Sequence, residues 1–553
     1  MSAAAGGAGA RPARTGIPIA LLIAVAAALY VYGAHEFALA EPDEGRYAEI
    51  AREMVAGGDW LTPHLNYVRY FEKPPLVYWA TALAFVGVGQ TELAARLPSL
   101  LSALATLCLT GWLATRLYGG ATALLAVGAL AASPLFGILA VVLTLDMALT
   151  AFMTAALCAA WAALARGGAP AWIRVAYAVT ALSILVKGPV SALLVGAPVA
   201  VFVVLHGGLG ALRPWLDWRG LALAAAIALP WFVLVGLRHP EFWHFFIVDQ
   251  HFTRFTSTRE HGEPFWFFLP ILPVALAPWG LVALLDPGAL RAAWDPRAWT
   301  LGTRFCALWA AVIVVFFSLS AGKLLTYILP AMPPLAILCA RLVLGSVALG
   351  RTAGLTRLGW LMLVGGPVMS ICAMVLPLLN DHWRVQAIAP YLFAAALPMA
   401  ATGFVTARLT ALGRPRAALV ALGLGWAVLF TITLAGRGAA NEYRPLALAA
   451  RAQLAAGDRL ALYRKYVQGM PYYTGRRVVF IGRGSELTFG SRQGDQSAWF
   501  WPDDAALLRE WAAPGRLFVL MNRTDLDRLR VQLDPPPIEI AAKDKKVLVK
   551  NRR

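Results

Sequence analysis

Hydrophobic residues dominate the first 435 or so positions, in runs of about 20 residues separated by short polar loops. A run of this length forms a helix that can cross the hydrocarbon core of a bilayer. The runs predict thirteen spans, near residues 17–34, 97–115, 120–140, 146–166, 172–186, 189–206, 219–237, 266–285, 303–320, 326–345, 357–378, 387–406 and 415–434. The first run lacks a clear cleavage site, so we expect it to be retained as an anchor.

One further apolar run, residues 76–89, is shorter and begins after Pro74-Pro75. If it is counted as a juxtamembrane or re-entrant helix, every arginine-rich loop falls on one side of the membrane. These loops carry Arg116, Arg166, Arg174, Arg213, Arg219, Arg291, Arg297, Arg304, Arg351, Arg357, Arg408, Arg414 and Arg416. Because positive loops favour the cytoplasm, the pattern predicts a cytoplasmic N-terminus and an external C-terminal segment.

From about residue 440 the chain becomes polar, and its pattern alternates between short strands and helices. Strands are predicted at Arg459–Arg464, Arg477–Ile481, Arg516–Met521 and Pro537–Ala541, and helices at 444–455, 503–513 and 524–530. This alternation predicts a small α/β domain, residues 438–553, after a membrane domain of residues 1–437. We expect the basic tail Lys543–Arg553 only to touch anionic lipid.

The composition agrees with a polytopic α-helical membrane protein. Only 14% of the residues are charged, whereas soluble domains are charged at about a quarter of positions. A net charge of +18 would suggest nucleic acid in a soluble protein, but most arginines lie in loops between spans, so no nucleic-acid partner is expected. All five cysteines lie in apolar runs, and we expect them to be core residues.

A charged stretch, Glu41-Pro42-Asp43-Glu44-Gly45-Arg46-Tyr47, directly follows the first span. Apolar residues recur at helical spacing from Tyr47 to Met54, and charged residues fall mostly on the other side. Pro42 can open such a helix, and Gly57-Gly58 can close it. We expect a short amphipathic helix on the membrane face, with Asp43 and Glu44 in its first turn. A charged cap that only fixes topology is the alternative.

Only three lysines precede residue 440, and the topology places all of them at the external ends of spans. They are Lys73, Lys187 and Lys323. A lysine at this depth is costly unless an anion pairs with it. Snorkelling to lipid headgroups would explain one such lysine, whereas three together favour a shared anionic ligand.

Further polar residues are predicted on the same face. Glu72 adjoins Lys73, and the two either form a simple ion pair or bind a phosphate and a substrate group. Asp146 is the only acid between Glu92 and Asp217, and it either caps the following helix or serves a functional site. The stretch 242–268 interleaves aromatics with histidines and arginines, and arginine suits bidentate binding of phosphate.

These motifs resemble the C superfamily of glycosyltransferases (GT-C), membrane enzymes that use polyprenyl-phosphate sugars and are related to protein O-mannosyltransferases. The shared features are the acid pair after the first span, Glu72-Lys73-Pro74-Pro75, Asp146, His251-x-x-Arg254-Phe255, Pro264-Phe265-Trp266 and Lys323-Leu324-x-x-Tyr327-x-Leu329-Pro330. The chain is most similar to the bacterial 4-amino-4-deoxy-L-arabinose transferases that modify lipid A. The resemblance implies a GT-C fold with about 13 transmembrane helices, periplasmic juxtamembrane helices and a periplasmic α/β domain.

The resemblance also implies a reaction and its partners. Aminoarabinose would pass from undecaprenyl phosphate to a lipid A phosphate at the periplasmic face of a Gram-negative inner membrane, by an inverting single displacement, giving resistance to cationic peptides such as polymyxin. The enzyme would be a monomer that binds donor, acceptor and membrane lipids. It would need no cofactor, because cations can hold a monophosphate leaving group; a divalent metal at Glu72 and His251 is the alternative.

On this interpretation Asp43 is the main catalytic candidate, and Asp146 is a supporting carboxylate. The residues expected to bind the donor phosphate are Arg46, Lys73, Lys187, Arg254 and Lys323. The residues expected to contact substrate are Glu44, Tyr47, Glu72, His251 and Tyr327. Two alternatives are protein O-glycosylation, with a stronger need for a general base, and lipid-phosphate transport without catalysis. Against transport, the polar groups gather on one face and do not line a path through the spans.

Overall fold

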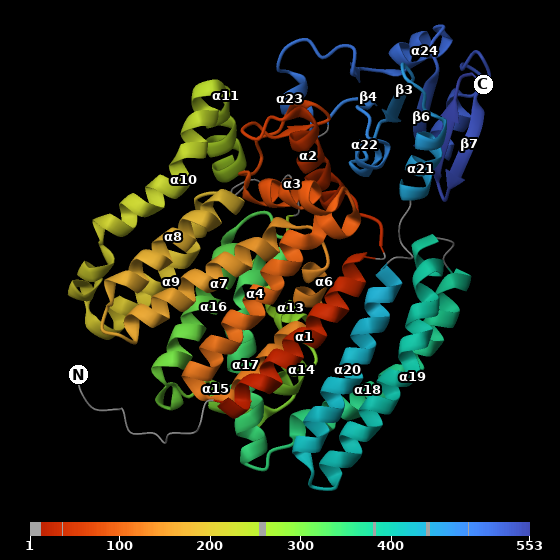
Figure 1. Cartoon of the computed structure of the whole chain (residues 1–553). Coiled ribbons are helices and arrows are strands. Elements are labelled where there is room, and N and C mark those ends of the chain that lie inside the picture. Colours follow the sequence, from red (N-terminus) through yellow and green to blue (C-terminus); the bar gives the residue numbers. More distant parts are fainter. Residues whose placement is uncertain are drawn as a thin grey trace.

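Long apolar helices form most of the molecule (Figure 1). The computed structural model describes residues 13–35, 37–253, 262–379, 383–437, 443–484 and 486–552. Eleven helices of the described chain are long and apolar enough to cross a membrane. They are α1 (Ala13–His35), α4 (Glu92–Tyr118), α7 (Leu145–Leu164), α8 (Pro170–Lys187), α9 (Val190–Gly207), α10 (Trp218–Arg238), α16 (Leu301–Leu319), α17 (Met332–Ala348) with the preceding turn η4 (Leu325–Ala331), α18 (Ala353–Leu379), α19 (Trp383–Ala411) and α20 (Pro415–Arg437). Each coincides with a predicted span.

The two remaining predicted spans are broken. Residues 120–140 form α5 (Gly120–Ala131) and α6 (Pro134–Ala140), which are bent by 66° at Pro134. Residues 266–285 form two short helices, α13 (Phe268–Ala275) and α14 (Trp279–Leu284), with Pro278 at the break. Proline has no N–H with which to continue a helix. Within the described ranges, the prediction of thirteen spans is thus corrected to eleven continuous helices and two broken segments.

A juxtamembrane layer lies between α1 and α4. It contains α2 (Asp43–Gly57), a hairpin of β1 (His64–Leu65) and β2 (Val68–Arg69), and α3 (Leu76–Val88). α2 begins after Pro42 and ends at Gly58, whose φ of 71° is left-handed, as the sequence predicts. α3 has 13 residues, too few to cross a bilayer. In Figure 1, α2 and α3 lie between the helical bundle and the C-terminal domain.

Shorter elements connect the long helices. They are η1 (Leu209–Trp215), α11 (Glu241–Trp243), the π-helix η2 (His244–Thr253), α15 (Pro287–Ala293) and η3 (Pro296–Ala298). α11 lies near the end of the bundle that carries α2, and α15 lies at the opposite end (Figure 1).

The C-terminal domain is a six-stranded sheet with helices, as expected for an α/β domain. The strand order is β5-β4-β3-β6-β8-β7, in which β8 runs antiparallel to both β6 and β7. The elements are α21 (Tyr443–Gln453), β3 (Arg459–Tyr463), α22 (Gly469–Thr474), β4 (Val479–Ile481), α23 (Thr488–Ser491), β5 (Phe500–Trp501), α24 (Asp504–Ala512), β6 (Leu517–Asn522), α25 (Arg523–Leu529), β7 (Ile538–Lys543) and β8 (Lys546–Lys550). The expectation that the tail Lys543–Arg553 only touches lipid is wrong, because β8 fills an interior position of the sheet.

The C-terminal domain covers α2. One hydrophobic core continues from Ile50 and Met54 of α2 into Met470 of α22. Glu49 and Glu53, on the charged side of α2, are also buried. The predicted amphipathic helix therefore exists, but its polar face is packed inside the protein and does not face water.

Candidate active site

Asp43 and Arg46 share the first turn of α2. Arg46 Nη1 donates a hydrogen bond to Asp43 Oδ1 over 3.0 Å. The side chain of Asp43 is 52% exposed, whereas that of Arg46 is 16% exposed. The N-terminal end of a helix favours negative charge, because its backbone N–H groups point outward. The Asp43 carboxylate is therefore held in place and accessible from outside.

A second polar cluster joins residues from three elements. Asp146 lies in the first turn of α7, Lys187 ends α8, and Tyr327 belongs to η4. Lys187 Nζ forms an ion pair with Asp146 Oδ1 and lies 4.7 Å from the centre of the Tyr327 ring. The structure thus places a carboxylate, a cation and an aromatic ring together, all three of them candidates from the sequence.

Tyr47 links the two clusters. Its side chain is buried in α2, and burial raises the pKa of its phenol. The nearby charges of Asp43, Asp146 and Glu72 raise this pKa further, while that of Arg46 lowers it. Arg46 lies 5.8 Å from the centre of the Tyr47 ring, and charges of both clusters shift the pKa of this one tyrosine.

The other two candidate lysines are oriented by backbone carbonyl groups. Lys73 Nζ donates to the carbonyl of Glu72 over 3.0 Å. Lys323 is 5% exposed, and its Nζ donates to the carbonyls of Glu263 and Ser320 over 2.8 and 2.6 Å. The two carbonyl acceptors orient the ammonium group of Lys323 without neutralising its charge.

Two candidates from the external stretch cannot be placed. Arg254 and the side chain of His251 lie outside the described residues, although the backbone of His251 belongs to η2. Across the described ranges, no group of three or more His, Cys, Asp or Glu side chains is arranged to hold a metal ion. The roles predicted for Arg254 and His251, including the alternative of a metal at Glu72 and His251, stay predictions.

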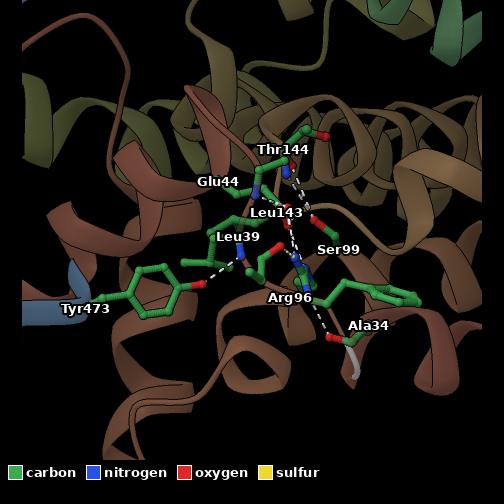
Figure 2. Close-up of polar contacts among 11 residues, drawn as sticks. Ala34, Leu39, Glu44, Arg96, Ser99, Leu143, Thr144 and Tyr473 are labelled. Carbon is green, nitrogen blue, oxygen red and sulfur yellow. Dashed lines mark hydrogen bonds and ion pairs between the residues drawn. The ribbon is translucent and has the colours of Figure 1, made fainter. Parts of the chain in front are cut away.

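Glu44 is fully buried and forms an ion pair with Arg96 (Figure 2). Arg96 Nε and Nη2 donate to the two carboxylate oxygens over 2.7 and 2.9 Å. The same carboxylate accepts the N–H of Leu143 over 2.8 Å, and Arg96 also donates to the carbonyl of Ala34 over 2.8 Å. Through these hydrogen bonds, Glu44 and Arg96 connect α1, α2, α4 and the turn before α7. Glu44 therefore has a structural role in place of the predicted substrate contact.

Two buried tyrosine hydroxyls border the site. Tyr70 and Tyr78 are 2% and 0% exposed, and no partner for either hydroxyl is found in the described part of the chain. Burial raises the pKa of both phenols, the charges of Glu72 and Glu486 raise it further, and that of Arg46 lowers it. Buried hydroxyls rarely lack a partner, so the two groups mark a place for water or a hydroxyl-bearing ligand.

Sequence reasoning missed several residues that shape the site. A signal for Arg96 was present, because a charge directly at the start of the predicted span 97–115 calls for a partner. Gln468 and Glu486, which lie near α2, carried no such signal. They belong to the C-terminal domain and reach the site only through the docking of the two domains.

Comparisons with known proteins agree with this geometry. The family model described as dolichyl-phosphate-mannose-protein mannosyltransferase matches residues 17–246, and that described as the aminoarabinose transferase C-terminal domain matches residues 446–551. The undecaprenyl phosphate-alpha-4-amino-4-deoxy-L-arabinose arabinosyl transferase of Enterobacter sp. (strain 638) is 33% identical over 65% of this chain and 64% of its own length. The protein of the same name from Pseudomonas aeruginosa (strain UCBPP-PA14) is 37% identical over 60% of this chain and 60% of its own length. The chain thus spans less than two thirds of the length of these curated relatives.

Two solved structures match nearly the whole chain. The crystal structure of ArnT from Cupriavidus metallidurans bound to undecaprenyl phosphate has a TM-score of 0.83 and 28% identity, over 98% of this chain and 99% of that one. The apo structure of the same protein has a TM-score of 0.82. The match therefore extends over the membrane helices, the juxtamembrane elements and the C-terminal sheet. The chain is therefore similar, over nearly its whole length, to the aminoarabinose transferases of the GT-C type.

Proposed function

We propose that the chain transfers 4-amino-4-deoxy-L-arabinose from undecaprenyl phosphate to a phosphate of lipid A. Relatives at 33% and 37% identity carry the name of this arabinosyl transferase, and a structurally similar protein has been crystallised with undecaprenyl phosphate. The observation that carries the proposal is the presence of two pairs of opposite charge, Asp43 with Arg46 beside Tyr47 and Asp146 with Lys187 beside Tyr327. This constellation combines cations for a phosphate with carboxylates for a sugar. Neither protein O-glycosylation nor lipid transport is favoured by these relatives.

The donor phosphate is the leaving group of the reaction. As the bond between the anomeric carbon and the phosphate oxygen breaks, its electron pair moves onto the phosphate, where positive side chains stabilise it. Arg46 and Lys187 are the cations closest to the candidate carboxylates, and Lys73, Lys323 and Arg254 are further candidates. These charges make a metal dispensable in the proposed scheme.

An oxygen of the acceptor phosphate forms the new bond to the anomeric carbon. This phosphate is already ionised near neutral pH, so the reaction hardly needs a general base. Asp43 instead orients the acceptor or stabilises positive charge at the anomeric carbon, and Asp146 supports Lys187. A single displacement of this kind inverts the anomeric centre.

We further propose that the enzyme acts as a monomer in a Gram-negative inner membrane, with its site and C-terminal domain in the periplasm. Two observations support this orientation. The arginine-rich connections mark the cytoplasmic side, and Figure 1 shows α15 at the end of the bundle opposite the C-terminal domain.

Mass spectrometry of lipid A tests the function. The chain is expressed in a strain that makes the donor but lacks this transferase activity. We expect lipid A to gain the mass of aminoarabinose, and NMR of the purified product to show the anomeric configuration inverted relative to the donor. Unmodified lipid A in the presence of confirmed donor would contradict the acceptor, and modified protein glycans would then favour O-glycosylation. Retention of configuration would contradict the single displacement.

A further inference from the structure

Two carboxylates from different domains hold the guanidinium of Arg46. Its Nη1 contacts Asp43 on the same helix over 3.0 Å, and its Nε lies 2.5 Å from Glu486 Oε2 in the C-terminal domain. The side chains of Arg46 and Glu486 are only 16% and 11% exposed. Water therefore screens the pair less than it would at the surface. A charge pair thus crosses the domain boundary beside the main catalytic candidate.

Glu486 is itself fixed within the C-terminal domain. Gln468 Nε2 donates to Glu486 Oε1 over 2.6 Å. The backbone N–H groups of Gln468 and Gly469 donate to the carboxylate of Glu41 over 3.0 and 2.6 Å. The domain therefore holds the chain at Glu41 and at Arg46, on both sides of Asp43 in the sequence.

This arrangement divides one guanidinium between two carboxylates: a hydrogen bond joins Nη1 to Asp43, and an ion pair without hydrogen-bond geometry joins Nε to Glu486. An arginine beside a single carboxylate commonly forms two parallel hydrogen bonds with it. Such a pair would occupy both oxygens of Asp43. The contact with Glu486 holds Nε of Arg46 on the side of the C-terminal domain, so only Nη1 is seen to bind Asp43.

We propose that Glu486 is a positioning residue of the transferase. By holding Arg46, it keeps Asp43 available to substrate, and the C-terminal domain thereby completes the active site. The inference rests on the proposed function, because Asp43 and Arg46 have their roles only in that reaction.

The test compares Glu486→Gln with Glu510→Gln in the purified full-length protein, with undecaprenyl-phosphate-linked aminoarabinose and lipid A as substrates. Glutamine keeps the acceptor for Gln468 but removes the charge that attracts Arg46. Glu510 pairs with Arg459 over 3.0 Å on the surface of the same domain, so it is a matched control. We expect kcat of Glu486→Gln to fall by about 10- to 100-fold with little change in KM, because the carboxylate is misplaced. Glu510→Gln should retain wild-type kcat.

Two further variants separate positioning from a merely structural role. Glu486→Asp should restore part of kcat. In an Arg46→Gln background, Glu486→Gln should cause no further loss, because Glu486 acts through Arg46. If Glu486→Gln does not fold, Gln468→Ala replaces it in the test. This variant removes the hydrogen bond that orients Glu486 but keeps the charge of Glu486. We expect kcat of Gln468→Ala to fall as well.

Wild-type kcat in folded Glu486→Gln, or in Gln468→Ala where that variant replaces it, would overturn the inference. So would a loss that is equally large with and without Arg46. These results require an active wild-type protein. If the wild type transfers no aminoarabinose while the donor is present, the proposed function itself fails.

Discussion

Lys187 illustrates how one side chain can serve both stability and chemistry. Its ammonium group is paired with Asp146 and covered by the ring of Tyr327. Both charged side chains are largely buried, at 15% and 13% exposed, and removal of one partner from such a pair leaves an uncompensated charge. The pair therefore joins α7 to α8 while it keeps a cation at the candidate site.

Replacing Lys187 by methionine should nearly abolish transfer. The substitution keeps most of the length of the side chain but removes the cation and the ion pair that Lys187 forms with Asp146. We expect kcat/KM to fall by about 100-fold or more, because the departing phosphate loses electrostatic stabilisation. Lys187→Arg should keep part of the activity. Purified protein and a direct assay of product provide the measurement, and unchanged kcat/KM in Lys187→Met would argue against a role in catalysis.

Most of the candidate residues could be found from sequence, because a polar residue at the end of an apolar helix has few structural explanations. Asp146 and Lys187 stand out for that reason and are in contact. Glu44 shows the limit of this reasoning. An acid at the start of a helix can face a substrate or the protein interior, and only the fold reveals Arg96, 52 residues away, as its partner.

At the scale of elements, α2 is the helix on which the site depends, and its start is fixed from several directions. Glu41 caps α22, Glu44 binds Arg96, and the hydrophobic side of α2 packs into the shared core. Rigid attachment suits a helix that must hold Asp43 in position, because small displacements of catalytic groups reduce rates strongly.

Glu44→Gln should destabilise the protein without changing its affinity for substrate. Arg96 would keep its buried charge and lose its counter-ion, which costs about 3–5 kcal/mol in comparable pairs. We expect a lower unfolding temperature in detergent and a lower yield, with KM of the folded fraction unchanged. An unaltered unfolding temperature together with a raised KM would instead restore the substrate contact predicted from sequence.

The positions of the helices were predictable, but the breaks in them were not. Pro98, Pro198 and Pro230 lie inside α4, α9 and α10, which continue past them. Pro134 and Pro278 instead begin new helices. Neighbouring helices can satisfy the backbone groups that a proline releases, so tertiary packing decides which prolines break a span.

At the scale of the whole molecule, the membrane and C-terminal domains share one core and a set of polar contacts. Asn66 exchanges two hydrogen bonds of 2.9 Å with the backbone of Val478, and Tyr473 accepts the N–H of Leu39 over 2.8 Å. These pairs are 412 and 434 residues apart in sequence. Local patterns identify each domain, but they contain no information on such docking.

The stability of this interface should fall as pH rises. Burial raises the pKa of Glu41 to about 8, although two backbone N–H groups oppose the shift. Burial likewise raises the pKa of Glu53 and Glu486. A carboxyl group with a raised pKa binds more protons in the folded than in the unfolded state, so the free energy of unfolding decreases between the unfolded and folded pKa values.

For Glu41 this window runs from the ordinary value of 4.5 to about 8. One such group contributes a slope of about 1.4 kcal/mol per pH unit within it. Thermal unfolding of wild type and Glu41→Gln at several pH values measures the effect. We expect the wild type to lose stability toward high pH and the variant to lose less. Equal slopes in the two proteins would contradict the assignment to Glu41.

The catalytic role of Asp43 is tested most directly by lipid A mass spectrometry of three proteins: wild type, Asp43→Asn and the exposed control Asp527→Asn. All are expressed in a strain that makes the donor, and membrane levels and folding are compared. We predict aminoarabinose on lipid A with the wild type and the control, and none with a well-folded Asp43→Asn. Modification by Asp43→Asn at the wild-type level would contradict the assignment of Asp43 as the catalytic carboxylate.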